Sequence, residues 1–475
     1  MTFGRTDVKN ERTRMFQVAY IGGGSLFLPS IVNGLAHEAK TLRDAGAEVA
    51  FDLYDIAPER AERMARYAAI AAGGLAIPLR ARVAPSLAEA MEGARLVFLS
   101  ISHPGLEEGW KALHEQFPVE PHGEGPARVA YEGSRVFEAC VPIGEEMAKR
   151  AAPGAVFATL VNPTDVIAGA FERRFGIRSI GMCCEVGGLI GMLAHHLGYR
   201  FEDFALNHVG VNHDGWVLGL RIQGEDRYGF VRERLPQIAR QGCVAQPPSA
   251  VPAQAEAPVP HGSPGFHPVS LMMLPVLRLT GHLRSSAYHR WPIVAGESID
   301  WGAALKPWPR KRDRHEAALE QALRAGQPIP DDEPVHPELS AFQYREFGRH
   351  IGQTMAAMAA GVPRVVPLQV RNAGASAQFP AEAVLEVPTL VAGTRIQPLA
   401  VGPAPDWLIP ATRSFALSRA LASQYLADPK LETLLHSLAV FPMFGVAENL
   451  LGFAEALHRG FALEKSDPPA IIQGG

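Results

Sequence analysis

Short apolar runs alternate with amphipathic segments over the first two hundred residues of the chain. The apolar runs cover residues 16–21, 47–55, 96–101 and 156–161. Between them, apolar residues recur at the three- and four-residue spacing of a helix. Strands that alternate with helices build a parallel sheet, because the connection between two parallel strands is usually helical. The pattern predicts a Rossmann-like, doubly wound parallel α/β domain over residues 15–200.

The remainder of the chain departs from this alternation. With 475 residues, the protein is longer than one compact core usually allows. We therefore expect a second, α+β domain over residues 201–475 that binds substrate and forms oligomer contacts. Residues 244–268 are rich in Pro and Ala and predict a surface insertion, and residues 428–462 predict apolar helices that suit a core or an oligomer interface. The polar residues 1–14 predict a flexible leader.

Composition and charge narrow the functional classes. Hydrophobic residues make up 47% of the chain and the net charge is -4, so nothing favours nucleic acid or an anionic membrane as a partner. No apolar stretch is long enough to span a bilayer, and the first residues lack the apolar core of a signal peptide. The cysteines stand at positions 140, 183, 184 and 243, too few for a disulfide scaffold of this size. We expect a cytoplasmic protein.

A glycine-rich turn follows the first apolar run, in the stretch VAYIGGGSLFLPSIVNG (residues 18–34). Such a turn between a strand and a helix lets phosphates sit on backbone N–H groups. Gly22 and Gly24 fit the motif G-x-G-x-x-G, but Phe27 stands at its third glycine. Asp55 ends the second run, where a carboxylate would accept hydrogen bonds from a ribose and repel a 2′-phosphate, which favours NAD over NADP. Unless this is a tight turn that binds nothing, the cofactor-binding residues are Gly22, Gly23, Gly24, Ser25, Asp55, Ser100 and Asn162.

Two further segments carry side chains that can bind metals. Cys183 follows a predicted strand in SIGMCCEVGG, with Cys184 and Glu185 directly after it. His213 lies further along the chain, in VGVNHDGW, also near a predicted strand end. A thiolate and an imidazole in such positions could share a divalent metal. Alternatively, the cysteine packs as a small apolar side chain and the histidine is a hydrogen-bonded core residue.

Several motifs, taken together, resemble glycoside hydrolase family 4, the NAD-dependent glycosidases that include 6-phospho-glucosidases, α-galactosidases and α-glucosidases. Between Val18 and Pro405 they are VAYIGGGS, LYDIAPERAE, VNPTD, GMCCEVGG, GVNHDGW, LRLTGHLRSSAYHRW and VRNAGASAQFPAEAVLEVPTLVAGTRIQPLAVGPAP. The resemblance implies an NAD cofactor, a divalent metal such as Mn²⁺, and a homodimer or homotetramer. It also implies that Cys183 and His213 bind the metal and that Asn162 contacts sugar hydroxyls near the nicotinamide.

The mechanism implied by the resemblance differs from that of ordinary glycosidases, which use two carboxylates. By this analogy NAD⁺ takes a hydride from C3 of the sugar, a base removes the C2 proton, the leaving group departs from C1, water adds, and the hydride returns. Tyr288 matches the region of the proposed base, and Glu185 is the nearest carboxyl group for the leaving-group acid. The predicted substrate-contacting residues are Asn162, Asn212, Glu124, Arg128 and Arg290.

Three departures from the family's pattern concern the substrate. Cys184 stands where members carry His, Asp or Asn, and Ser102 falls where phosphate-specific members carry Arg. The Q-E-T-x-G segment of the family is altered around Glu124. These departures predict an unusual glycoside, either neutral or with an anionic C6 group such as phosphate or sulfonate. The alternative functions are a net NAD-dependent dehydrogenase of a hydroxy acid or sugar, and a non-catalytic NAD-binding sensor.

Overall fold

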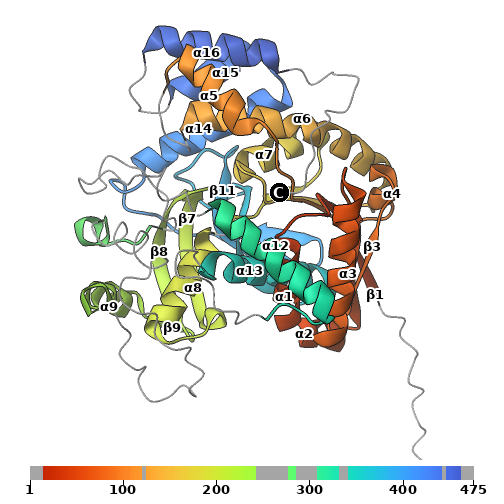
Figure 1. Ribbon diagram of the computed structural model, residues 1–475. Helices are drawn as coiled ribbons and strands as arrows, with labels where there is room; N and C mark the ends of the chain where they lie inside the picture. The colour runs from red at the N-terminus through yellow and green to blue at the C-terminus, as the bar shows by residue number, and fades with distance from the viewer. Residues whose placement is uncertain are drawn as a thin grey trace, which may run out of the picture.

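The computed structural model describes residues 14–119, 125–183, 185–241, 276–284, 308–330, 341–440 and 446–461. Within these residues, all strands belong to one mixed sheet (Figure 1). The strands are β1 (Arg14–Ile21), β2 (Ala47–Tyr54), β3 (Leu79–Val83), β4 (Leu96–Leu99), β5 (Val156–Thr159), β6 (Ser179–Gly181), β7 (Phe204–Val211), β8 (Asp214–Ile222), β9 (Glu225–Asp226), β10 (Arg364–Arg371), β11 (Val384–Ala392) and β12 (Arg395–Pro398). Their order is β3-β2-β1-β4-β5-β6-β10-β11-β7-β8-β9, and β12 pairs with β11.

The first six strands form the predicted doubly wound sheet. Each pairs in parallel with its neighbours in the order β3-β2-β1-β4-β5-β6, which is the strand order of a Rossmann fold. Along β1, Val18 and Tyr20 enter one hydrophobic core, while Ala19 and Ile21 enter a second core on the opposite face. Both faces of the sheet are therefore buried, which explains why these strands read as continuous apolar runs.

Helices cover both faces of this sheet. One core includes residues of α1 (Leu28–His37), α2 (Ala39–Asp44), α3 (Pro58–Gly74), α12 (Trp308–Ala325) and α13 (Ala341–Ala360). The opposite core includes residues of α4 (Leu87–Met91), α6 (Pro126–Arg150), α7 (Thr164–Phe175), α15 (Leu431–Ala439) and α16 (Ala447–Gly460), with α5 (Leu106–Gln116) packed against it. Helix α14 (Pro410–Ala427) contributes to both cores, and α5, α14, α15 and α16 gather at the top of Figure 1. A third core lies around α8 (Glu185–Leu197), the short helix η1 (Phe201–Asp203), β7, β8 and α9 (Tyr228–Gln241).

A close crossing of two helices joins segments far apart in the sequence. A Cβ atom on Gly34 of α1 would lie 1.8 Å from the carbonyl oxygen of Gly348 in α13. A Cβ atom on Gly348 would in turn lie 2.0 Å from the carbonyl oxygen of Ser30. Only glycine permits this approach of the two backbones. The sheet also continues across residue 200, so the division into domains at that point stays a prediction.

Several local predictions differ from the structure. Strand β1 begins at Arg14, and the Arg14 guanidinium donates hydrogen bonds of 2.8 Å to the carbonyls of Ala359 and Ala360, so Arg14 belongs to the sheet rather than to a leader. The apolar pattern predicts neither the break between α1 and α2 nor strand β3, whose alternate residues are exposed. Residues 1–13 and the segment 244–268 lie outside the described residues. No helix among the described residues is long and apolar enough to cross a membrane.

Candidate functional site

The glycine turn lies at the point where β1, β2 and β4 end side by side. Gly22 has a positive φ of 86°, and a Cβ atom there would lie 2.0 Å from the carbonyl oxygen of Ser100. The N–H groups of Gly22 and Gly23 both donate to the carbonyl of Tyr54, each over 2.9 Å. The turn is therefore enclosed by the two neighbouring strands. Gly22 is required both for its backbone conformation and for the space it leaves.

The Asp55 carboxylate links this turn to the start of helix α3 by hydrogen bonds. It is buried, and its two oxygens accept hydrogen bonds from the N–H of Gly24 at 2.9 Å and from the N–H of Ala57 at 3.0 Å. Beside it, the Ser100 hydroxyl donates to the Ser25 hydroxyl over 2.8 Å. The structure thus brings the predicted cofactor-binding residues of three strand ends together. A bound ribose would donate hydrogen bonds to the same Asp55 carboxylate that accepts from these two N–H groups. The contact with ribose stays a prediction.

Phe27 shows how the turn accommodates the departure from the glycine motif. It precedes helix α1 and is partly buried against the first core. The third glycine of the motif normally allows close packing of helix on strand. In this chain Phe27 stands at that position, and the close approach that α1 makes at Gly34 is to another helix, α13.

Asn162 follows β5 and is joined to the other half of the sheet by amide hydrogen bonds. The Asn212 side chain donates to Asn162 Oδ1 over 3.0 Å, and the Gln369 side chain donates to Asn212 Oδ1 over 2.8 Å. The structure therefore brings together the two asparagines predicted to contact substrate. Gln369 is absent from the sequence-based site. Its signal in the sequence was a polar residue between Leu368 and Val370, in a strand whose other interior residues are apolar.

Cys183 and His213 meet although their strands are not neighbours. The Cys183 Sγ lies 3.1 Å from His213 Nε2, and both side chains are buried. Cys183 follows β6, His213 lies in the two-residue turn between β7 and β8, and β10 and β11 separate these strands. His213 also has a positive φ of 61°, which is unusual for a residue other than glycine. Residues with a strained backbone conformation are often found at functional sites.

Cys183 and His213 are residue types that bind divalent metals, and they also lie within hydrogen-bonding distance of each other. In the described part of the chain, no group of three His, Cys, Asp or Glu side chains is arranged to hold a metal. Metal binding by Cys183 and His213 stays a prediction.

Two buried carboxyl groups lie around this pair. Glu185 Oε1, at the first residue of α8, is 3.7 Å from His213 Nε2. Glu386, on β11, is fully buried, and burial together with the charge of Glu185 raises its pKa to about 8. Glu386 is a second residue that the sequence-based site lacks. It too was visible only as a polar residue within an apolar strand.

Buried ion pairs hold the loops of the site. Asp165 pairs with Arg419 over 2.7 Å and also accepts a hydrogen bond from the backbone N–H of Asn212. Asp214 pairs with Arg284, whose guanidinium lies 4.8 Å from the centre of the Trp216 ring. Removing one member of such a pair leaves a buried charge uncompensated, which is strongly destabilising. These pairs therefore fix the positions of the residues between them.

Three other predicted site residues lie outside the described part of the chain: Glu124, Tyr288 and Arg290. Arg128 is buried at the start of α6, where it pairs with Glu107 and Glu132 and lies 5.0 Å from the centre of the Trp110 ring. Two carboxylates thus compensate its charge, and its contact with substrate stays a prediction.

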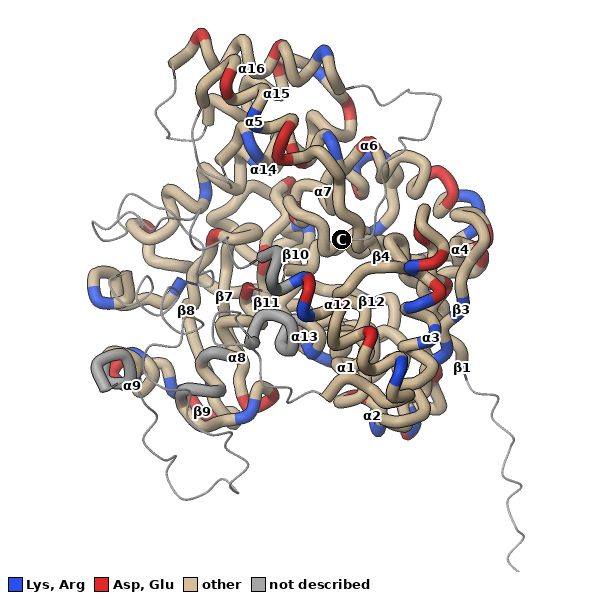
Figure 2. The backbone as a smooth tube through the Cα atoms, viewed as in Figure 1, with Lys and Arg blue, Asp and Glu red and all other residues tan. Residues whose placement is uncertain are grey.

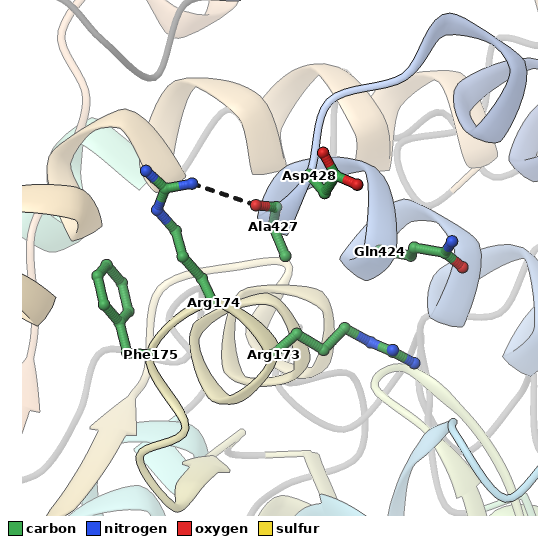
Figure 3. Close-up of a pocket in the computed structure, with 6 residues that line it drawn as sticks. All are labelled: Arg173, Arg174, Phe175, Gln424, Ala427 and Asp428. Carbon is green, nitrogen blue, oxygen red and sulfur yellow. Dashed lines mark hydrogen bonds between the residues drawn. The ribbon is translucent and has the colours of Figure 1, made fainter.

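The surface offers a separate hollow of about 470 Å³ where α7 and α14 end (Figure 3). Arg174 crosses it and donates a hydrogen bond of 3.2 Å to the carbonyl of Ala427. Its lining contains none of the predicted site residues: Arg173, Arg174, Phe175, Gln424, Ala427 and Asp428. Figure 2 shows basic and acidic residues interspersed along the helices, α3 among them. The hollow is therefore separate from the site around Cys183.

Two curated relatives match part of the chain. An alpha-galactosidase of Bacillus subtilis is 22% identical over 262 residues, which are 55% of this chain and 55% of the relative. A 6-phospho-alpha-glucosidase 1 of Lacticaseibacillus paracasei is 28% identical over 218 residues, which are 44% of this chain and 47% of the relative. The chain thus spans about half the length of the curated relatives it matches.

The fold and the family extend over more of the chain. A 6-phospho-beta glucosidase of Thermotoga maritima, solved with manganese, NAD⁺ and glucose-6-phosphate, superposes with a TM-score of 0.67 at 18% identity, covering 94% of this chain and 99% of that chain. The model of the Family 4 glycosyl hydrolase matches residues 17–199, and that of the Family 4 glycosyl hydrolase C-terminal domain matches residues 208–440. The protein therefore belongs to family 4 of the glycosyl hydrolases.

Proposed function

We propose that this protein is an NAD-dependent glycosidase that uses a divalent metal and a redox-neutral mechanism. The observation that carries the proposal is the combination, in one family 4 chain, of the enclosed glycine turn and the 3.1 Å Cys183–His213 pair. Ordinary glycosidases need two carboxylates and no dinucleotide. A dinucleotide turn and a metal-ligand pair on one sheet fit oxidation followed by elimination.

The two bound groups would supply the chemistry that side chains lack. Bound NAD⁺ would accept a hydride from C3 of the sugar and later return it, and a divalent metal, Mn²⁺ by family resemblance, would polarise the C3 oxygen. Residues 22–25, Asp55 and Ser100 would hold the dinucleotide. Cys183 and His213 would hold the metal.

The chain's own side chains would then orient the sugar and move its protons. Asn162 and Asn212 would hold hydroxyl groups of the sugar. Tyr288 would remove the C2 proton once C3 is a ketone, because a neighbouring carbonyl acidifies that proton. Glu185, close to His213, would protonate the departing oxygen at C1.

The substrate class we propose is a sugar glycoside with an anionic group at C6. Matched relatives include a 6-phospho-alpha-glucosidase, which supports a phosphate there. Ser102 stands in place of the usual Arg of the phosphate contact, which supports either a different anion, such as a sulfonate, or a neutral glycoside. Arg128 and Arg290 are the proposed anion contacts and Glu124 a proposed sugar contact. We also propose a homodimer or homotetramer in the cytoplasm, from the family resemblance and the low cysteine content.

Hydrolysis in D₂O tests the mechanism. Because the base exchanges its proton with solvent, the sugar product should carry deuterium at C2, while C3 stays protiated because its hydride returns from the same NADH. Nuclear magnetic resonance of the product distinguishes the two positions. A product without deuterium at C2 would refute the redox-elimination mechanism.

The same incubation separates the alternative functions. Stoichiometric accumulation of NADH with no broken glycosidic bond would indicate a net dehydrogenase. Retention of NAD⁺ with no turnover over a broad panel of glycosides would indicate an NAD-binding sensor.

A further inference from the structure

A buried chain of hydrogen bonds leads from helix α7 to the exposed side chain of Asn162. It starts at the Thr164 hydroxyl, which donates to Gln369 Oε1. Gln369 Nε2 donates to Asn212 Oδ1, and Asn212 Nδ2 donates to Asn162 Oδ1. Thr164, Gln369 and Asn212 are each 0% exposed, whereas Asn162 is exposed. The orientation of the one exposed amide is thus linked to three groups that solvent does not reach.

Thr164 sets the direction in which this chain donates. It is the first residue of α7, where unpaired backbone N–H groups provide donors and few acceptors, so its hydroxyl donates outward to Gln369 Oε1. With its oxygen held by Thr164, the Gln369 amide has its nitrogen free to donate to Asn212 Oδ1. The amide orientations of Gln369 and Asn212 therefore follow from one hydroxyl group.

We infer that Thr164, Gln369 and Asn212 are positioning residues that make Asn162 present its side-chain nitrogen, and hence a hydrogen-bond donor, to the ligand. Because Asn162 Oδ1 is occupied by Asn212, the Nδ2 group is the part left to bind. A donor at this place recognises an uncharged oxygen acceptor, either a sugar hydroxyl or the carboxamide oxygen of nicotinamide. The inference rests on the proposed function for its ligand, but not for the orientation of the amide.

The first test removes the proton that starts the chain. Thr164→Val keeps the side-chain shape but cannot donate, so kcat/KM should fall about tenfold, the factor that one hydrogen bond contributes. Thr164→Ser keeps the hydroxyl and should restore kcat/KM to within about twofold. Thr354→Val is the matched control, because Thr354 is equally buried and donates only to the His350 carbonyl within α13. Equal kcat/KM in Thr164→Val and Thr354→Val, or no rescue by serine, would overturn the inference.

The second test changes the exposed end and identifies the acceptor. Asn162→Asp keeps the contact with Asn212 but offers the ligand no donor. If KM for the glycoside rises about tenfold or more while the NAD⁺ affinity is unchanged, the donor is assigned to the sugar. A similar loss in NAD⁺ affinity, measured by calorimetry without sugar, assigns it to the nicotinamide. Full activity and full NAD⁺ affinity would overturn the inference.

A third measurement does not depend on turnover or on the folding of a variant. Neutron diffraction from the deuterated wild-type protein locates the deuterons of the Asn162 amide directly. Deuterons that face away from Asn212 support the inference even if no glycoside is hydrolysed, in which case only the proposed function fails. Deuterons that face Asn212 overturn it whatever the enzyme hydrolyses.

Discussion

His213 stands in a backbone conformation that costs free energy, and a pair of substitutions can measure that cost. His213→Gly and His213→Ala both delete the imidazole and its contact with Cys183. They differ in one methyl group, which at a φ of 61° approaches the backbone unfavourably. We predict that the glycine variant is the more stable of the two, which is the reverse of the usual order in helices and strands.

The size of the difference follows from two opposing terms. The left-handed conformation costs a residue with a Cβ atom about 1–2 kcal/mol. Glycine loses about 0.5–1 kcal/mol more than alanine through the conformational freedom of its unfolded chain. The net difference should be about 1 kcal/mol in favour of His213→Gly.

Urea unfolding in the presence of a chelator is the appropriate assay, because metal bound by the native state would add its own stabilisation. Both variants should bind NAD⁺ like the wild-type protein and lack turnover. An alanine variant more stable than the glycine variant by about 0.5–1 kcal/mol, the ordinary difference between the two residues, would show that the turn is not strained. The strain could then no longer be taken as a sign of function at His213.

Further predictions concern the cofactor turn, the metal ligands and two buried histidines. Gly24→Val should abolish NAD⁺ binding in a calorimetric titration, since a Cβ atom there would lie 2.4 Å from Arg60 Cβ and displace the turn; unchanged affinity would remove the dinucleotide assignment. The wild-type protein should bind Zn²⁺ more tightly than Mn²⁺, and Cys183→Ser should reduce this difference in affinity, because thiolate favours the softer ion. The same ratio of Zn²⁺ to Mn²⁺ affinity in the wild-type protein and in the variant would argue against Cys183 as a ligand. Burial lowers the pKa of His208 and of His350 to about 4. Their contribution to the stability of the native state is therefore complete above the ordinary pKa of 6.5, and it is lost as the pH falls towards 4. The free energy of unfolding should therefore drop over that range and drop less in His350→Gln, and an equal drop in both proteins would contradict the prediction.

The sequence by itself determined the local parts of this protein. Apolar runs predicted β1, β2, β4 and β5, because strands buried on both faces have few polar positions. The glycine turn was predictable because residues 22–24 and their flanking strand and helix are contiguous in the chain. Asp55 was predictable as a residue of the turn's environment, and its bond to the Ala57 N–H is local, but its bond to the Gly24 N–H was not predictable, since Gly24 reaches it only when β1 and β2 pair.

The tertiary structure alone decided how the second half of the site is built. Strands β10 and β11 enter the sheet between β6 and β7, and this places Gln369 and Glu386 between the segments that carry Cys183 and His213. Such antiparallel pairings join residues more than 150 positions apart, so no local pattern of apolar and polar residues records them. Asp165 likewise meets Arg419 only because α7 packs against α14. A polar residue in an apolar strand is locally unfavourable, and only the partners that the fold brings to it explain why it is there.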